Sequence, residues 1–241
     1  MKSKANRMFA AITVLAALAC ALALVGCGQS SPSSSSSAAA ASASSSAASA
    51  QAGSKAQAEG PYATGVHHAQ MTVEGYDPIT IELDADAAPT SVANFCTLAS
   101  EGYYDGLTFY RFAEGFCMQG GTMGNSASGS DPNLKAIVGE FSGNGYDNPL
   151  ADNFVKGTVA MARTGDPNSA RSTFFVTLDS SPMVSQSLNG QYAAFGTIDE
   201  AGMAIVDKIV ADYLPNVTDP RMGAIDDESK QAKIASIKIV D

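Results

Sequence analysis

The chain has 241 residues, and its 14 Lys and Arg against 24 Asp and Glu give a formal net charge of −10 at pH 7. This acidic balance argues against nucleic acid and against anionic lipid headgroups as direct partners, because both require an excess of basic side chains. The Cys and His residues do not show metal-ligand spacing, so the sequence predicts no bound metal and no other cofactor.

Residues 1–26 have the pattern of a secretory signal peptide. Basic residues stand at the start, residues 8–25 are almost wholly apolar, and the sequence Leu-Val-Gly precedes Cys27. This ending resembles a bacterial lipobox, which implies cleavage before Cys27 and lipidation of its thiol. Two alternatives stay open, namely a signal peptide that receives no lipid and a retained membrane helix. We expect a mature protein that is anchored in the cell membrane through lipid on Cys27, at the extracytoplasmic face.

Residues 27–60 should form a flexible spacer between the lipidated cysteine and a folded domain. Ser and Ala fill residues 31–50 except at Pro32, and such a stretch cannot bury enough apolar surface to offset the entropy lost on ordering. The rest of the chain, residues 61–241, has the length of one ordinary domain with a substantial core. We expect this domain to be a monomer.

The pattern along this domain is mainly β. Alternating apolar residues predict strands at 67–74 and 78–84, and a helix begins at Pro89 and ends at Gly102. A second helix is expected at residues 200–211. Short apolar runs predict further strands near residues 107–112, 116–119, 157–162, 173–178, 193–198 and 234–240. Strands in succession with two isolated helices favour a closed antiparallel β-barrel capped by two α-helices.

Two cysteines remain in the domain once Cys20 has left with the signal peptide and Cys27 carries lipid. An extracytoplasmic compartment permits a disulfide between Cys96 and Cys117. The pattern places Cys96 in the middle of a helix and Cys117 in a strand, and we therefore expect both thiols to be free.

The run Phe-Tyr-Arg-Phe-Ala-Glu-Gly-Phe-Cys-Met-Gln-Gly-Gly at residues 109–121 sets a cation, aromatic rings and an amide along two short β-like segments joined at Gly115. Because strand residues alternate faces, Phe109 and Arg111 should share one side. A cation beside an apolar surface suits a ligand that is apolar at one end and carries a carbonyl at the other.

This run resembles the central signature of the cyclophilins, the peptidyl-prolyl cis-trans isomerases. Four further segments resemble the family in the same order, partly in its bacterial form. They are Asp-Ala-Ala-Pro-Thr-Ser-Val-Ala-Asn-Phe at 86–95, Gly-Thr-Val-Ala-Met-Ala-Arg-Thr at 157–164, Ser-Ala-Arg-Ser-Thr-Phe-Phe-Val at 169–176 and Leu-Asn-Gly-Gln-Tyr-Ala-Ala-Phe-Gly at 188–196. The resemblance implies the same capped barrel and a substrate that is a proline-containing polypeptide.

The resemblance also implies the roles of individual residues. Arg111 matches the catalytic arginine, which contacts the carbonyl of the substrate proline and can stabilise the nitrogen lone pair; an isolated arginine would more often form a surface salt bridge. Gln119 matches a ligand of the substrate backbone, with a hydrogen bond inside the barrel as the alternative. Ala162 and Arg163 would border the groove, with the Ala162 backbone pairing an extended substrate. The walls of the proline slot would be Phe116, Cys117, Phe175, Leu188 and Tyr192.

Several residues depart from the common family pattern. Thr173, also expected to contact substrate, stands where a glutamine usually lies beside the arginine, and it is too short to make the same contact. Cys117 replaces a common methionine, which widens the slot and makes it less apolar. Ser187 stands where some members have a tryptophan that binds cyclosporin, and Tyr192 replaces histidine. The arginine and the aromatic floor survive, so we expect an active isomerase whose rate Thr173 and Cys117 can lower.

Other segments have simpler expected roles. Residues 142–148 form an added loop with respect to the family, and we interpret it as a solvated turn rather than a surface for partner specificity. His67 and His68 should lie before the first strand as exposed side chains with no role in proton transfer.

The sequence therefore supports three functions in descending order. The first is a membrane-tethered prolyl isomerase that speeds folding of secreted proteins by electrostatic stabilisation of the twisted peptide. The second is a catalytically weakened peptide-binding or holdase module on the same fold. The third, a lipoprotein that captures a small solute, is disfavoured because the domain is too short for a two-lobed solute binder.

Overall fold

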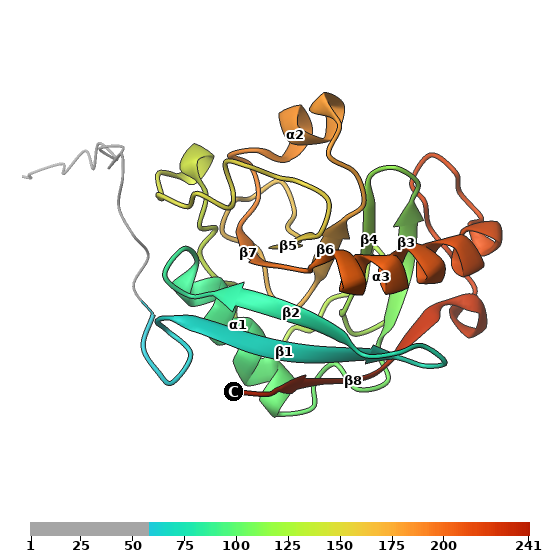
Figure 1. Ribbon diagram of the computed structural model, residues 1–241, viewed down its shortest axis with the longest axis horizontal. Helices are drawn as coiled ribbons and strands as arrows, with labels where there is room; N and C mark the ends of the chain where they lie inside the picture. The colour runs from blue at the N-terminus through green and yellow to red at the C-terminus, as the bar shows by residue number, and fades with distance from the viewer. Residues whose placement is uncertain (1–57) are drawn as a thin grey trace, which may run out of the picture. The chain divides into compact units, whose positions relative to one another are not determined.

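The computed structural model describes residues 58–241 (Figure 1). The expected signal peptide and Cys27 lie outside the described residues, as does the spacer up to residue 57. Within the described part of the chain, no helix combines the length and the apolar character needed to cross a membrane.

The strands close into an antiparallel barrel (Figure 1), which confirms the predicted fold class. Around the barrel the order is β1-β2-β7-β5-β6-β4-β3-β8, so that the first strand pairs with both the second and the last. The strands are β1 (Val66–Val73), β2 (Ile79–Asp84), β3 (Thr108–Ala113), β4 (Cys117–Gly120), β5 (Thr158–Met161), β6 (Phe174–Thr177), β7 (Ala194–Thr197) and β8 (Ala232–Ile239).

Two of the three α-helices found in residues 58–241 match the prediction. In α1 (Pro89–Ser100) and α3 (Glu200–Tyr213) the apolar faces are buried. The helix α2 (Pro182–Leu188) was missed, because its seven residues bury only Val184 and Leu188 and so show little periodicity. This omission matters because α2 ends at a residue of the candidate site.

The beginning of α1 is held by a carboxylate from a distant loop. The residue before the helix, Ala88, has no side chain that could cap it. Instead the buried Glu140 accepts hydrogen bonds from the backbone N–H groups of Thr90 and Ser91, each at 2.8 Å, and from the Ser91 hydroxyl at 2.6 Å. A negative charge at a helix N-terminus is stabilising. Glu140 thereby fixes the long segment between β4 and β5 against the barrel.

Aromatic rings fill much of the core. Phe174 makes edge-to-face contacts with Phe95, Tyr104 and Phe109 at centroid distances of 5.4 to 5.6 Å, and all four side chains are fully buried. Such pairs add roughly 0.5–1.5 kcal/mol each beyond the burial of their area. The contact between Phe109 and Phe174 thus holds β3 against β6 inside the barrel. It thereby also fixes where the outer faces of these two strands lie.

A β-bulge in β3 overturns one prediction about side-chain direction. Phe109 pairs with Gly120 and Arg111 pairs with Gln119, so Tyr110 is the extra residue. A bulge interrupts the alternation of faces. The Phe109 ring therefore packs in the core, whereas the Arg111 side chain, two residues later, extends to the outer wall.

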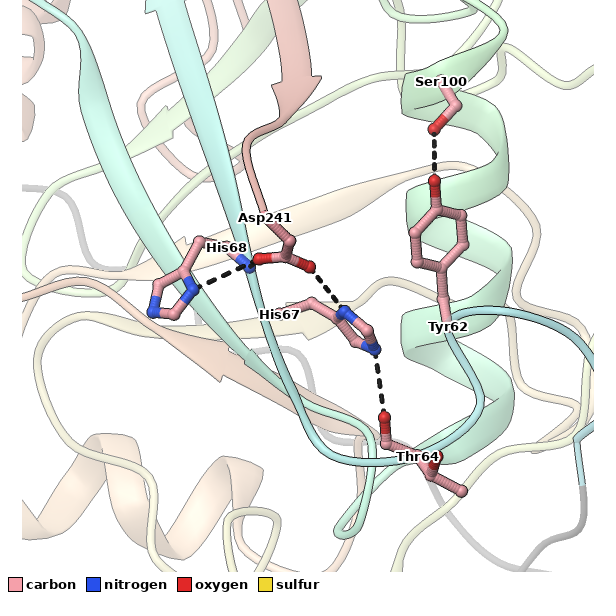
Figure 2. Close-up of polar contacts among 6 residues, drawn as sticks. All are labelled: Tyr62, Thr64, His67, His68, Ser100 and Asp241. Carbon is pink, nitrogen blue, oxygen red and sulfur yellow. Dashed lines mark hydrogen bonds and ion pairs between the residues drawn. The ribbon is translucent and has the colours of Figure 1, made fainter.

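His67 and His68 lie within β1 and not before the first strand as predicted (Figure 2). The His67 side chain is only 15% exposed, whereas His68 is exposed as predicted. The His67 Nδ1 lies 2.5 Å from an Asp241 carboxylate oxygen and its Nε2 lies 3.0 Å from the Thr64 carbonyl oxygen. Both neighbouring oxygens are hydrogen-bond acceptors.

The same carboxylate also binds the next residue of the strand. Asp241 accepts a 2.7 Å hydrogen bond from the His68 backbone N–H, and the His68 Nδ1 lies 3.3 Å from the same oxygen (Figure 2). Partial burial opposes ionisation of Asp241, but the hydrogen bonds from His67 and His68 outweigh it and lower its pKa. The contact joins the start of β1 to the segment after β8.

We predict that Asp241→Asn destabilises the domain in a pH-dependent way. Because the pKa of Asp241 is lowered in the folded state, the ionised carboxylate adds stability at neutral pH, and this contribution is lost as the pH falls through the lowered value. The free energy of unfolding should drop in the variant at about pH 6 and much less at about pH 3, measured by chemical denaturation. Asp77→Asn, at an exposed turn residue, controls for net charge. An equal loss at both pH values would contradict the prediction.

Candidate active site

A pocket of about 160 Å³ on the outer wall of the barrel brings together nine of the ten predicted site residues. They come from β3, the turn before β4, β4, β6, the residues after β5, and the end of α2 with the turn that follows it. The lining residues are Arg111, Phe116, Cys117, Gln119, Ala162, Arg163, Phe175, Leu188 and Tyr192.

Arg111 is held by three neighbours. Its Nη1 donates to the Gln119 side-chain oxygen at 2.9 Å, and its Nε donates to the Met222 carbonyl at 2.7 Å. The guanidinium carbon lies 5.6 Å from the centre of the Phe116 ring, within the range of a cation–π contact. The guanidinium has five N–H donors, so further N–H groups remain available to a ligand in the pocket. Arg111 forms none of the ion pairs found among the described residues.

Gln119 connects Arg111 to a buried tyrosine. The Gln119 amide nitrogen donates to the Tyr110 hydroxyl at 2.8 Å, while its oxygen accepts from Arg111. Tyr110 is 3% exposed, and burial raises the pKa of its hydroxyl, which therefore stays neutral. The barrel hydrogen bond that was the alternative for Gln119 is thus present. One amide hydrogen and one oxygen lone pair remain for a substrate backbone.

The apolar wall of the pocket is built on Phe175. This ring stacks on Phe154, with centroids 6.2 Å apart and planes 11° apart, and meets the edge of Tyr192 at 5.6 Å. Leu188, the last residue of α2, completes the wall and is 2% exposed. The stacked contact to Phe154 and the edge-to-face contact to Tyr192 restrict the orientation of the Phe175 ring. This restriction fixes the shape of the apolar wall.

Arg163 also borders the pocket and is fixed by two rings. Its guanidinium carbon lies 4.7 Å from the Tyr192 ring centre and 5.2 Å from that of Phe141. It also donates to the carbonyls of Gln191 and Thr164, at 2.9 and 2.8 Å. Arg163 therefore holds Tyr192 in place, a contact that a short polar side chain could not make.

The loop 142–148 is exposed at Ser142, Gly143 and Asp147, as predicted for a solvated turn, but it also makes a structural contact. Its short helical turn, Ser142–Asn144, packs on the turn that carries Tyr192, where the Gly143 N–H donates to the Gly190 carbonyl at 2.9 Å. A Cβ on Gly143 would lie 2.4 Å from that oxygen, and one on Gly190 would lie 2.6 Å from the Ser142 hydroxyl. The loop thus supports the apolar wall from behind.

Thr173 is the predicted residue that the pocket does not include. It lines an adjacent hollow of about 330 Å³, which shares Gln119, Ala162 and Arg163 with the first pocket. The Ala162 N–H already donates to the Thr173 carbonyl at 2.9 Å. The prediction assigned the whole Ala162 backbone to pairing with an extended substrate, but only its carbonyl is left for that role. Ser187, on α2, lies outside both linings.

Four contributors to the site were missed: Tyr110, Phe141, Phe154 and Met222. The first lies inside the central run and could have been found by asking what its hydroxyl binds. The two phenylalanines support pocket residues from distant loops, and the last contributes a backbone carbonyl, which leaves no trace in the sequence. No group of three or more His, Cys, Asp or Glu in residues 58–241 is arranged to hold a metal ion.

A closed antiparallel barrel whose outer wall carries an arginine beside an aromatic pocket has the arrangement expected of the cyclophilin fold. Residues 68–239 match the sequence family described as cyclophilin type peptidyl-prolyl cis-trans isomerase/CLD. Since this match covers more than half of the chain, the protein belongs to the cyclophilin-type peptidyl-prolyl cis-trans isomerase family.

Individual relatives agree with this membership. A probable peptidyl-prolyl cis-trans isomerase of Brucella suis is 42% identical over 136 residues, which cover 54% of this chain but only 65% of the relative. Peptidyl-prolyl cis-trans isomerase A of Dickeya dadantii is 35% identical over 159 residues, covering 64% of this chain and 77% of the relative. The chain thus spans less than two thirds of the Brucella protein.

Solved structures support the fold. The crystal structure of a cyclophilin type peptidyl-prolyl cis-trans isomerase from Cryptosporidium parvum superposes with a TM-score of 0.58 at 24% identity, over 73% of this chain and 99% of that one. The same protein in the presence of the dipeptide Ala-Pro gives a TM-score of 0.57.

We predict that Cys117 behaves as a small apolar group and not as a reactive thiol. Burial raises its pKa to about 11, although Arg111 partly opposes this, and burial raises the pKa of Cys96 to about 12. Both are free and fully buried, so iodoacetamide at about pH 8 should leave them unmodified until the protein is unfolded. Peptide mapping would measure this, and rapid labelling of native Cys117 would contradict it.

Proposed function

We propose that this protein is a peptidyl-prolyl cis-trans isomerase that accelerates rotation about Xaa-Pro bonds in polypeptides. The observation that carries the proposal is the fixed Arg111 guanidinium in a pocket that has an apolar wall. A proline ring fits such a pocket, and the peptide carbonyl is then within reach of a permanent cation. The names of the relatives point to the same activity.

Isomerisation needs no covalent step. Rotation about an Xaa-Pro bond has a barrier of ~18–20 kcal/mol, and it passes through a twisted peptide in which amide resonance is lost. An acceleration of about 10⁵-fold requires roughly 7 kcal/mol of preferential binding of that twisted state. We expect Arg111 to provide part of it by donating to the carbonyl oxygen and to the pyramidal prolyl nitrogen. Fixed donors beside an apolar wall need no reorganisation as the peptide twists.

The second candidate is a peptide-binding or holdase module. Thr173 favours it, because it lies in the adjacent hollow and makes no side-chain contact with Arg111. Against it stand the contacts of Arg111 to Gln119 and Met222, which hold the guanidinium without help from residue 173. We therefore retain the isomerase as the main proposal.

We further propose that the domain acts outside the cytoplasm, held to the cell membrane by lipid on Cys27 through the spacer 27–60. The basis is the sequence alone: an apolar segment ending in Leu-Val-Gly-Cys, followed by a Ser- and Ala-rich stretch. The substrates would then be secreted proteins that fold after export, and the domain would work as a monomer.

We predict that Arg111→Ala lowers kcat/KM on an Xaa-Pro peptide by roughly tenfold or more while the domain stays folded. The reason is the loss of the cation next to the twisted bond. Lys238→Ala is the control, because its side chain is an exposed cation on β8 and does not line the pocket. An unchanged rate in Arg111→Ala would contradict the catalytic assignment. Peptide binding without turnover in the unmodified protein would favour the holdase.

A further inference from the structure

The outer edge of β3 is covered by a segment that does not belong to any strand. β8 pairs with β3 only at Thr108 and Phe109. Beyond that point residues 222–225 take over the edge: the Ile225 N–H donates to the Tyr110 carbonyl at 2.9 Å, and the Phe112 N–H donates to the Gly223 carbonyl at 2.7 Å. The segment therefore runs alongside Arg111, which forms an antiparallel bridge with residue 224.

Gly223 makes this close approach possible. Its φ is +74°, a conformation that side-chain-bearing residues rarely adopt. A Cβ at this position would lie 2.6 Å from the Phe112 carbonyl oxygen and 2.8 Å from the backbone nitrogen of Ala113. Any other residue would push the segment away from β3.

The segment delivers one carbonyl group to the guanidinium. The Met222 carbonyl oxygen accepts from the Nε of Arg111 at 2.7 Å. The turn that carries it is closed by the Asp219 carbonyl, which accepts from the N–H groups of Met222 and Gly223 at 3.2 and 2.7 Å. Because the guanidinium is a rigid plane, this contact and the one to Gln119 together fix its orientation.

We infer that Gly223 is a positioning residue for isomerisation: it lets the Met222 carbonyl hold Arg111 in the orientation that meets the substrate. The inference rests on the proposed function of Arg111. A free arginine side chain samples many rotamers, and each encounter with substrate would have to order it again. With the segment in place, that ordering is completed when the protein folds. Loss of the segment should therefore slow the reaction step more than it weakens substrate binding.

The test is Gly223→Ala, made in the unmodified chain and in Arg111→Ala. In the unmodified background kcat should fall about fivefold or more with little change in KM. In the Arg111→Ala background the same substitution should have almost no further effect, because the residue it acts through is gone. Gly75→Ala is the matched control: its φ is +87°, and a Cβ there meets nothing within 4 Å. Its kcat should match that of the unmodified chain.

An independent readout is the exchange of the Arg111 Nε–H with solvent, followed by NMR. It should be slow in the unmodified chain and fast in Gly223→Ala. If Gly223→Ala does not fold, Asp219→Ala loosens the turn by removing the side chain that accepts from the Arg221 N–H at 3.0 Å, and a smaller loss of kcat is expected.

The inference is overturned if Gly223→Ala keeps full kcat in a folded protein, or if it lowers kcat equally in both backgrounds. The proposed function fails separately, if the unmodified chain gives no turnover at all. In that case slow exchange of the Arg111 Nε–H would still show that the segment holds the guanidinium, whereas fast exchange would refute the contact as well.

Discussion

The β-bulge in β3 is the constraint on which the site depends. It turns the chain so that Phe109 enters the aromatic core and Arg111, only two residues later, reaches the outer wall. The facing strand has to accept this distortion. Gly120 lies opposite, and a Cβ on it would be 2.2 Å from the Thr108 carbonyl oxygen. The backbone therefore determines that Phe109 points into the core and Arg111 points outward. This does not depend on the rotamer of the Arg111 side chain.

Fixing the cation matters because the individual contacts are small. A hydrogen bond to a charged group contributes about 1.5–3 kcal/mol, while the proposed acceleration needs roughly 7 kcal/mol. One hydrogen bond therefore cannot supply all of the required preferential binding. Two conditions follow: the donors must already be in place before substrate binds, and the proline ring must be held in the pocket. The wall in which Phe175 stacks on Phe154 and meets Tyr192 edge-to-face provides the second condition. Arg111, held by Gln119 and Met222, provides the first.

Support for the pocket comes from parts of the chain that are far apart in sequence. Glu140 anchors the long segment after β4 to α1, and the neighbouring Phe141 lies under the guanidinium of Arg163. The loop 142–148 then braces the turn that carries Tyr192. One face of the site is thus maintained by a segment whose own residues hardly enter the pocket.

The sequence pattern alone predicts the barrel and two of the helices, because these rest on side-chain type and order. The residues of the pocket lining come from the resemblance to the cyclophilins. Leu188 and Tyr192 meet Phe175 as their places in the motifs imply. What the sequence does not predict depends on the backbone or on distant packing. The bulge at Tyr110 reverses an alternation that an ideal strand would keep. The role of Met222 rests on its backbone carbonyl, a group that every residue has, so the residue type gives no sign of it. Thr173 lies outside the pocket, directly before β6, where its carbonyl accepts from the Ala162 N–H after β5; this pairing between distant segments is not encoded in a local pattern.

Exchange NMR on an Ala-Pro peptide, with a substoichiometric amount of the purified protein, distinguishes catalysis of rotation from mere binding of peptide. If the protein is an isomerase, exchange cross-peaks appear between the cis and trans forms that are absent without protein. The cis and trans populations stay unchanged, because a catalyst speeds both directions equally. Peptide signals that shift on binding while cis–trans exchange stays as slow as in buffer would contradict the proposed isomerase activity.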